Sequence, residues 1–150
     1  MRKLTSLLSL MGTAAVVTLS PVQAQSAQTF PIGEGYLFQE VAKDPVLAQQ
    51  FAEITKPLNT HFSWVAKFGT ASPAERIKVD GKTYTVYQAC KPHNCPAESY
   101  VVLYNAHDKK MVAGAFVQNK YEQGVLLDSK VSWLGTQAAD FAPALSQYLF

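Results

Sequence analysis

The stretch "RIKVDGKTYTVYQAC" (residues 76–90) decides the fold of this chain. Apolar and polar side chains alternate on both sides of the dipeptide Asp80-Gly81. A period of two is typical of a half-buried strand, and Asp-Gly accommodates the positive φ angles of a tight hairpin turn. The stretch therefore predicts two antiparallel strands, the second of which runs directly into Cys90.

Strand-like segments continue toward the C-terminus. "SYVVLYN" and "KMVAGAFVQ" are separated by the polar "AHDK" and predict a second hairpin, and "VLLDSKVSWLG" predicts one or two more strands. We expect the aromatic residues at strand positions to pack the sheet. They are Tyr84, Tyr87, Tyr100, Tyr104, Phe116 and Trp133.

Helical patterns flank these strands. In "KDPVLAQQFAEITKP", Asp44 can cap the first turn, Pro45 fits the first helical position and Pro57 ends the run. "LNTHFSWVAKFGT" fits either a second short helix or an irregular apolar segment that ends at Gly69. "TQAADFAPALSQYLF" is helical in pattern, although Pro143 would end or kink the helix. We therefore expect an α+β fold, with an antiparallel sheet of about five strands, helices packed on one face and a protruding 90–95 loop.

The N-terminus indicates the compartment of the protein. Arg2 and Lys3 precede the mostly apolar "LTSLLSLMGTAAVVTL", and Val22-x-Ala24 is a typical cleavage pattern. This arrangement predicts a secretory signal peptide over residues 1–24 rather than a membrane anchor, and a single periplasmic domain over residues 25–150.

The charge of the mature domain argues against two classes of partner. Without Arg2 and Lys3, the basic residues fall from 13 to 11 and equal the 11 acidic residues. No run of Lys or Arg remains, so the composition favours neither nucleic acid nor a membrane surface as a partner.

Both cysteines of the chain lie in "CKPHNC" (residues 90–95). In an oxidising compartment we expect Cys90 and Cys95 to form a disulfide, which closes residues 90–95 into a covalent loop that we name the ring. A loop this short gains only about 2 kcal/mol of stability from closure. Closure and Pro92 instead restrict the residues between the cysteines, which favours presentation of His93 in one geometry.

Other interpretations of the ring stay open. The disulfide could have a purely structural role in the connection between two strands, with His93 as a solvated polar residue. A redox role is disfavoured because oxidoreductases use Cys-x-x-Cys before a helix. A metal site would need His61 or His107 to join the ring.

No catalytic motif accompanies the ring. Gly-x-Ser-x-Gly, His-Glu-x-x-His and glycine-rich phosphate loops are absent from the sequence, so we expect neither an enzyme nor a cofactor. Glu98, Asp108 and Glu122 are scattered carboxylates, which are most simply solvated surface charges. His61 lies beside Phe62 and is more simply a core or surface histidine than a functional one.

The ring and its surroundings resemble the bacterial inhibitor of vertebrate lysozyme family. The similar segments are "YxVYQAC" with "CKPHNC", "DPVLAQQF", "GTASPAERIKVDGKTY" and "WLG", of which the ring is the most specific. The family pattern commonly has Asp where this chain has Asn94, which keeps hydrogen bonding without the charge.

The resemblance implies a role for each residue of the ring. His93 would enter the active-site cleft of a c-type lysozyme, with Lys91, Pro92 and Asn94 as flanking contacts. The resemblance also permits lytic transglycosylases as targets, and it permits a homodimer. The alternative is a periplasmic disulfide-containing binding or redox protein without a glycosidase target.

Overall fold

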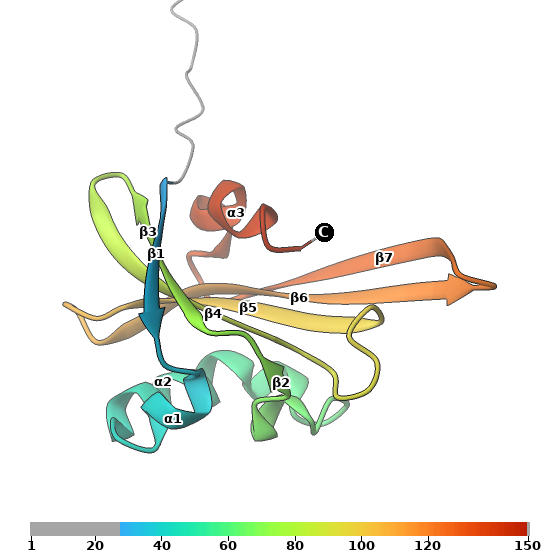
Figure 1. Cartoon of the computed structure of the whole chain (residues 1–150), viewed down its shortest axis with the longest axis horizontal. Coiled ribbons are helices and arrows are strands. Elements are labelled where there is room, and N and C mark those ends of the chain that lie inside the picture. Colours follow the sequence, from blue (N-terminus) through green and yellow to red (C-terminus); the bar gives the residue numbers. More distant parts are fainter. Residues whose placement is uncertain (1–27, 150) are drawn as a thin grey trace, which may run out of the picture.

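The computed structural model describes residues 28–149, and the predicted signal peptide lies outside them. These residues form a seven-stranded antiparallel sheet with helices on both of its faces (Figure 1). The strands are β1 (Gln28–Glu34), β2 (Thr70–Ala71), β3 (Ala74–Val79), β4 (Lys82–Cys90), β5 (Glu98–Asn105), β6 (Lys110–Glu122) and β7 (Val125–Leu134). The helices are α1 (Leu37–Val41), α2 (Pro45–Thr55) and α3 (Ala138–Ser146), with short 3-10 turns η1 (Lys56–Leu58) and η2 (Val65–Lys67).

The sheet order puts β4 and β5 at the centre. The strands follow the order β1-β3-β4-β5-β6-β7, and the two-residue β2 pairs with the end of β4, where Thr70 faces Cys90. On the other side of β4, Cys90 faces Ser99 of β5. The connection from β4 to β5 therefore leaves from the middle of the sheet.

The predicted α+β class is confirmed, but the helices do not share one face. α1 and α2 pack on one side of the sheet and α3 packs on the other (Figure 1). The reason is visible in β5, where every residue from Tyr100 to Asn105 is buried. A strand with both faces covered has a continuous apolar run rather than an alternating one. The predicted antiparallel sheet of about five strands is also confirmed, and β1 and β2 extend it to seven.

The first face carries the aromatic core. α2 packs its buried side chains on this face, where the Phe51 ring contacts the Tyr100 ring of β5 with centroids 5.6 Å apart. The other face carries mainly aliphatic side chains beneath α3. The buried α2 residues are Leu47, Phe51, Ile54 and Thr55.

The predicted local signals for α2 and for the first hairpin are confirmed. Asp44 Oδ1 accepts hydrogen bonds from the backbone N of Val46 (2.9 Å) and of Leu47 (3.3 Å), which caps α2. Asp80 and Gly81 have φ angles of 49° and 77°, as the hairpin turn requires.

Two ambiguous segments are resolved by the structure. The residues after α2 form η1 and η2 in an otherwise irregular path, and Phe68 and Gly69 leave it with φ angles of 66° and 61°. Helix α3 continues through Pro143 to Ser146, so the proline does not end it.

Candidate functional site

The predicted disulfide is confirmed. Cys90 and Cys95 are bonded with a Cα–Cα distance of 4.7 Å. Cys90 is the last residue of β4, and β5 begins three residues after Cys95, at Glu98. The ring therefore forms the tip of a hairpin between the two central strands.

A tight turn inside the ring places His93 at a corner. The backbone N of Asn94 donates to the carbonyl of Lys91 (3.0 Å), with Pro92 and His93 between them. His93 has a φ of 63°, and proline followed by a positive φ is the pattern of a type II turn. A side chain in the left-handed region costs roughly 1–2 kcal/mol relative to glycine. The turn therefore carries an imidazole at a position where its backbone favours glycine.

The corner of the turn faces solvent. Pro92, His93 and Asn94 are exposed, whereas Lys91 is half-buried. Among residues 28–149, no group forms a hydrogen bond or ion pair with the His93 imidazole. Both ring nitrogens of His93 are therefore available to hydrogen-bond groups of another molecule.

Glu98 anchors the base of the ring, contrary to its predicted role as a solvated charge. Its side chain is 15% exposed and accepts hydrogen bonds from Lys91 Nζ (2.8 Å) and from Trp64 Nε1 (2.7 Å). The backbone N of Lys91 also donates to the carbonyl of Glu98 (2.9 Å). The Glu98 carboxylate therefore links the ring to Trp64 in the irregular segment between α2 and β2. Because Cys90 pairs with Ser99, the hairpin register would have placed Lys91 opposite Glu98.

An aromatic layer supports the ring from below. The Trp64 ring stacks on Tyr100, with centroids 5.8 Å apart, and the Tyr100 hydroxyl donates to the carbonyl of Phe68 (3.2 Å). A Cβ at Gly69 would lie 2.5 Å from the Cys90 carbonyl oxygen and 2.6 Å from the Trp64 ring. Glycine at this position lets β2 approach the ring closely.

A second support comes from β6. The backbone N of Asn119 donates to the carbonyl of Ala97 (2.7 Å), and Asn119 Nδ2 donates to the carbonyl of Pro96 (2.9 Å). Asn119 Oδ1 in turn accepts from Ser129 Oγ of β7 (2.8 Å). The segment that follows the ring is thus hydrogen-bonded to the β6–β7 hairpin.

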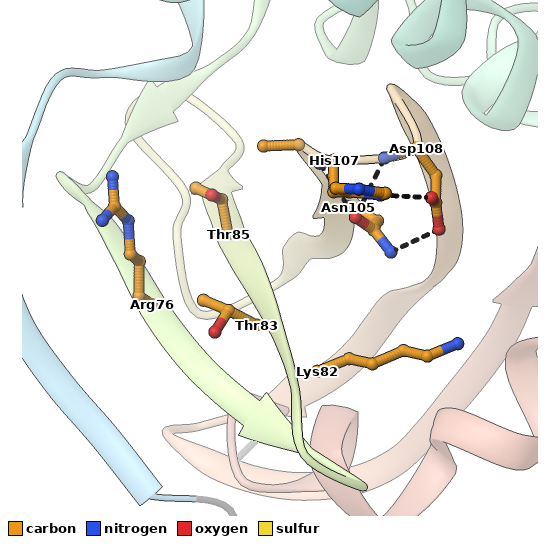
Figure 2. Close-up of a pocket in the computed structure, with 8 residues that line it drawn as sticks. Arg76, Lys82, Thr83, Thr85, Asn105, His107 and Asp108 are labelled. Carbon is orange, nitrogen blue, oxygen red and sulfur yellow. Dashed lines mark hydrogen bonds and ion pairs between the residues drawn. The ribbon is translucent and has the colours of Figure 1, made fainter.

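A concave region of about 760 Å³ lies at the opposite end of the sheet (Figure 2). Strand β5 runs from the ring to the β5–β6 turn, so the length of the strand separates the two sites. The region is lined by Arg76, Lys82, Thr83, Thr85, Asn105, Ala106, His107 and Asp108.

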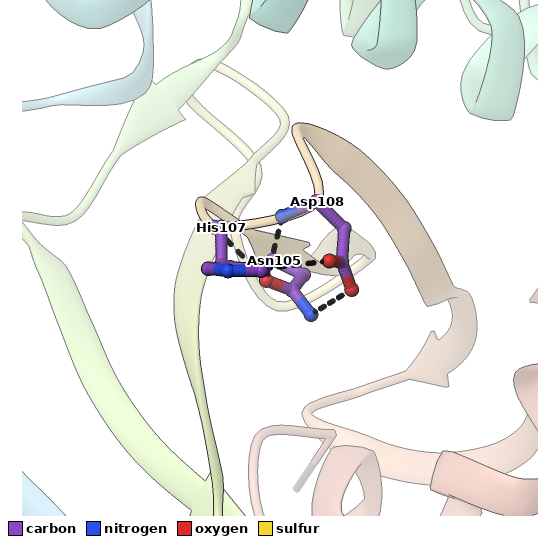
Figure 3. A network of polar contacts seen from close by, with 3 residues as sticks. All are labelled: Asn105, His107 and Asp108. Atoms are coloured by element: carbon purple, nitrogen blue, oxygen red, sulfur yellow. Dashed lines mark hydrogen bonds and ion pairs between the residues drawn. The ribbon is translucent and has the colours of Figure 1, made fainter.

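A network of polar contacts in that region lies in the β5–β6 turn (Figure 3). Asn105 Oδ1 accepts from the backbone N of His107 (3.0 Å) and of Asp108 (3.2 Å). Asn105 Nδ2 donates to Asp108 Oδ2 (2.8 Å), and His107 Nδ1 lies 2.8 Å from Asp108 Oδ1. An asparagine that bonds the backbone two and three residues ahead stabilises a turn. The network therefore has a structural explanation, and the His107 side chain is almost fully exposed.

The remaining predicted residues are a histidine, His61, and the aromatic residues of the strands. His61 is exposed and its ring contacts Phe62. Trp133 is also exposed, which contradicts its predicted role in packing, whereas Tyr84, Tyr87, Tyr100, Tyr104 and Phe116 are buried as predicted.

Residues 28–149 contain no group of three or more His, Cys, Asp or Glu residues arranged to hold a metal ion. No helix in the same range has the length and apolar character that a membrane crossing requires.

Comparison with known proteins gives one family. The family model for inhibitor of vertebrate lysozyme matches residues 46–144, which include the ring and both of its supports. The proteins named inhibitor of vertebrate lysozyme from Escherichia coli strain K12 and from strain O157:H7 are each 33% identical to the chain over 79 residues. That match covers 51% of this chain and 46% of each relative, so it spans about half the length of the curated relatives. The extent of the family match shows that the chain belongs to the inhibitor of vertebrate lysozyme family.

Proposed function

We propose that this protein is a periplasmic inhibitor of c-type lysozyme, which acts by inserting His93 into the active-site cleft of the enzyme. The observation that carries the proposal is the solvent-facing imidazole of His93 at the corner of a disulfide-closed turn. Family membership and the names of the two relatives support the choice of target.

The chemistry of such a cleft fits an imidazole. A retaining glycosidase holds two carboxyl groups about 5 Å apart, one protonated and one ionised. The two imidazole nitrogens point in different directions, so the ring can bridge both carboxyls, and it donates to each when it is protonated. A bridge of this kind occupies the groups that the enzyme needs for catalysis.

The rigidity of the ring lowers the cost of binding. A lysine or arginine could supply charge, but each would lose the freedom of a long side chain on binding. Here the disulfide, Pro92 and the Lys91–Asn94 hydrogen bond fix the backbone of the turn before any partner arrives. Preorganisation of this kind converts more of the contact energy into affinity.

The backbone of His93 supports the same proposal. A residue kept in the left-handed region, where a histidine is strained, is a reason to look for function at that position. Without a function for the side chain, glycine would satisfy this turn better.

The direct test is inhibition of a purified c-type lysozyme in a turbidity assay with bacterial cell walls. We expect the wild-type protein to inhibit in a stoichiometric complex, and His93→Ala to weaken inhibition by about 2 kcal/mol, roughly 30-fold. His107→Ala is the matched control, because it removes another exposed imidazole at the far end of the sheet. Equal inhibition by the wild type and His93→Ala would refute the insertion of His93.

The disulfide has its own test. We expect Cys90→Ser with Cys95→Ser to lose about 2 kcal/mol of stability, to remain folded and to bind lysozyme more weakly. Thermal unfolding and the turbidity assay are measured on the same preparation. A loss of inhibition no larger than the loss of stability would favour a purely structural disulfide.

The same proposal includes the location of the protein and a second target. Residues 1–24 would direct export, which fractionation of cells that express the full chain would measure. A lytic transglycosylase acts on the same polymer as lysozyme and would be inhibited through the same ring. In a peptidoglycan release assay, a wild-type protein that does not inhibit would remove this target, and inhibition that survives His93→Ala would show that the ring is not the inhibitory element.

A further inference from the structure

The β6–β7 hairpin extends beyond the rest of the sheet at the end that carries the ring (Figure 1). Strand β5 begins at Glu98, which pairs with Gln118 of β6. The residues of β6 after Gln118 therefore pair only with β7. The hairpin overhangs the sheet at this point.

The overhang exposes large apolar side chains. They lie on the two strands near the turn, where Tyr121 and Leu126 form a cross-strand pair. We name this group the hairpin tip, and its members are Tyr121 (44% exposed), Val125 (60%), Leu126 (44%) and Leu127 (52%). Soluble proteins rarely leave such groups uncovered unless they form an interaction site.

The hairpin tip and the ring are parts of one hydrogen-bonded assembly. Asn119, just before the tip, holds the carbonyls of Pro96 and Ala97, which directly follow the ring. Ser129 of β7 hydrogen-bonds to the side chain of Asn119 from the other strand. A partner that engages the ring therefore meets the hairpin as a neighbouring surface.

The ring is too small to form a stable interface alone. Four residues lie between the two cysteines, whereas a standard protein interface uses roughly 20–30 residues on each side. A polar hot spot also requires surrounding contacts that exclude water. Pro92 and Asn94, which flank His93, are themselves solvent-exposed.

We infer that the hairpin tip is a second contact surface for the same lysozyme, and that it packs on apolar residues at the rim of the cleft which His93 enters. The inference rests on the proposed function, because it assigns further surface to the same partner. The tip would bury apolar area and close one side of the His93 contact to water.

The test compares two polar variants in the lysozyme assay, using protein purified after expression of the full chain. Val125→Ser with Leu127→Ser removes apolar surface from the tip. Val46→Ser is the matched control, since Val46 is 38% exposed in the first turn of α2. α2 contacts the start of β6, where Gln50 accepts from the backbone N of Met111, at the other end of that strand from Asn119.

We expect the double variant to raise the inhibition constant at least about tenfold and the control to leave it within twofold. Thermal unfolding of both variants should match the wild type, because the replaced side chains are exposed. A double variant that inhibits as well as the wild type would overturn the inference.

Two other outcomes separate this inference from its alternatives. If the wild type inhibits and only His93→Ala loses inhibition, the proposed function stands and the role of the tip is wrong. If light scattering shows a wild-type dimer that the double variant dissociates with no change in inhibition, the tip binds a second copy and the inference is also wrong. A wild type that does not inhibit lysozyme would refute both proposals.

Discussion

Replacing His93 by glycine should separate the stability of the protein from its function. The φ of 63° at this residue lies in the left-handed region, where a side chain costs roughly 1–2 kcal/mol. Glycine removes that cost but gains about 0.5–1 kcal/mol of freedom in the unfolded chain. The net change in the free energy of unfolding is therefore between about zero and 1.5 kcal/mol in favour of the variant.

Inhibition should change in the opposite direction. Loss of the imidazole would remove the proposed contacts to both carboxyls of the enzyme, which we expect to cost about 2 kcal/mol or roughly 30-fold in the inhibition constant. The variant would thus unfold at an equal or slightly higher temperature than the wild type while it binds lysozyme far more weakly.

The assay combines thermal unfolding with a lysozyme titration. His93→Asn serves as a companion variant, because asparagine tolerates the left-handed region but has a neutral amide in place of the imidazole. A glycine variant that loses stability together with inhibition would show that the imidazole packs within the protein. A glycine variant that inhibits normally would show that the side chain does not contact the enzyme.

Three more predictions concern the supports of the ring. Gly69→Ala should destabilise the fold and weaken inhibition, because its Cβ would collide with the carbonyl of Cys90; unfolding and inhibition at the wild-type level would show that β2 can move away. Glu98→Gln keeps an acceptor for the indole but loses the charge that holds Lys91, so we expect a few-fold weaker inhibition at nearly unchanged stability, whereas Glu98→Ala should lower both. Burial raises the pKa of Tyr100 above its ordinary value of 10.0, so the folded protein keeps a proton that the unfolded chain loses, and stability should fall as the pH rises above about 10. In urea titrations from pH 8 to 11, Tyr100→Phe should be less stable at pH 8 through loss of its hydrogen bond and should lose less stability at high pH; an identical slope for both proteins would contradict this.

The elements with strong local signals were predictable from the sequence. Asp44 with Pro45 defines the start of α2, and Asp80-Gly81 defines the first hairpin, because both depend on backbone preferences of a few adjacent residues. The ring was predictable for the same reason, since its two cysteines are separated by only four residues.

The arrangement of the helices was not predictable in the same way. Whether α3 lies on the face of α2 or on the opposite face depends on contacts between distant segments. The available sequence signal was the continuous apolar run "YVVLY" of β5, which is typical of a strand with both faces covered. The strand propensity of Trp133 did not predict its burial. Trp133 lies on the edge strand β7, where the aromatic side chain stays exposed.

The residues that support the ring could not be predicted from the sequence, because most of them are far from it along the chain. Trp64 is 34 residues from Glu98, and Asn119 is 23 residues from Pro96, so sequence spacing gives no sign of these contacts. Lys91 and Glu98 are different, because strand register alone would have paired them.

The short span of the disulfide has a consequence for biogenesis. A chain with two cysteines has one intramolecular pairing, so no scrambled isomer exists for an isomerase to correct. Because the thiols are five residues apart, they meet readily in the unfolded chain. Oxidation can therefore precede assembly of the sheet, and the polypeptide can fold around a bond that is already in place.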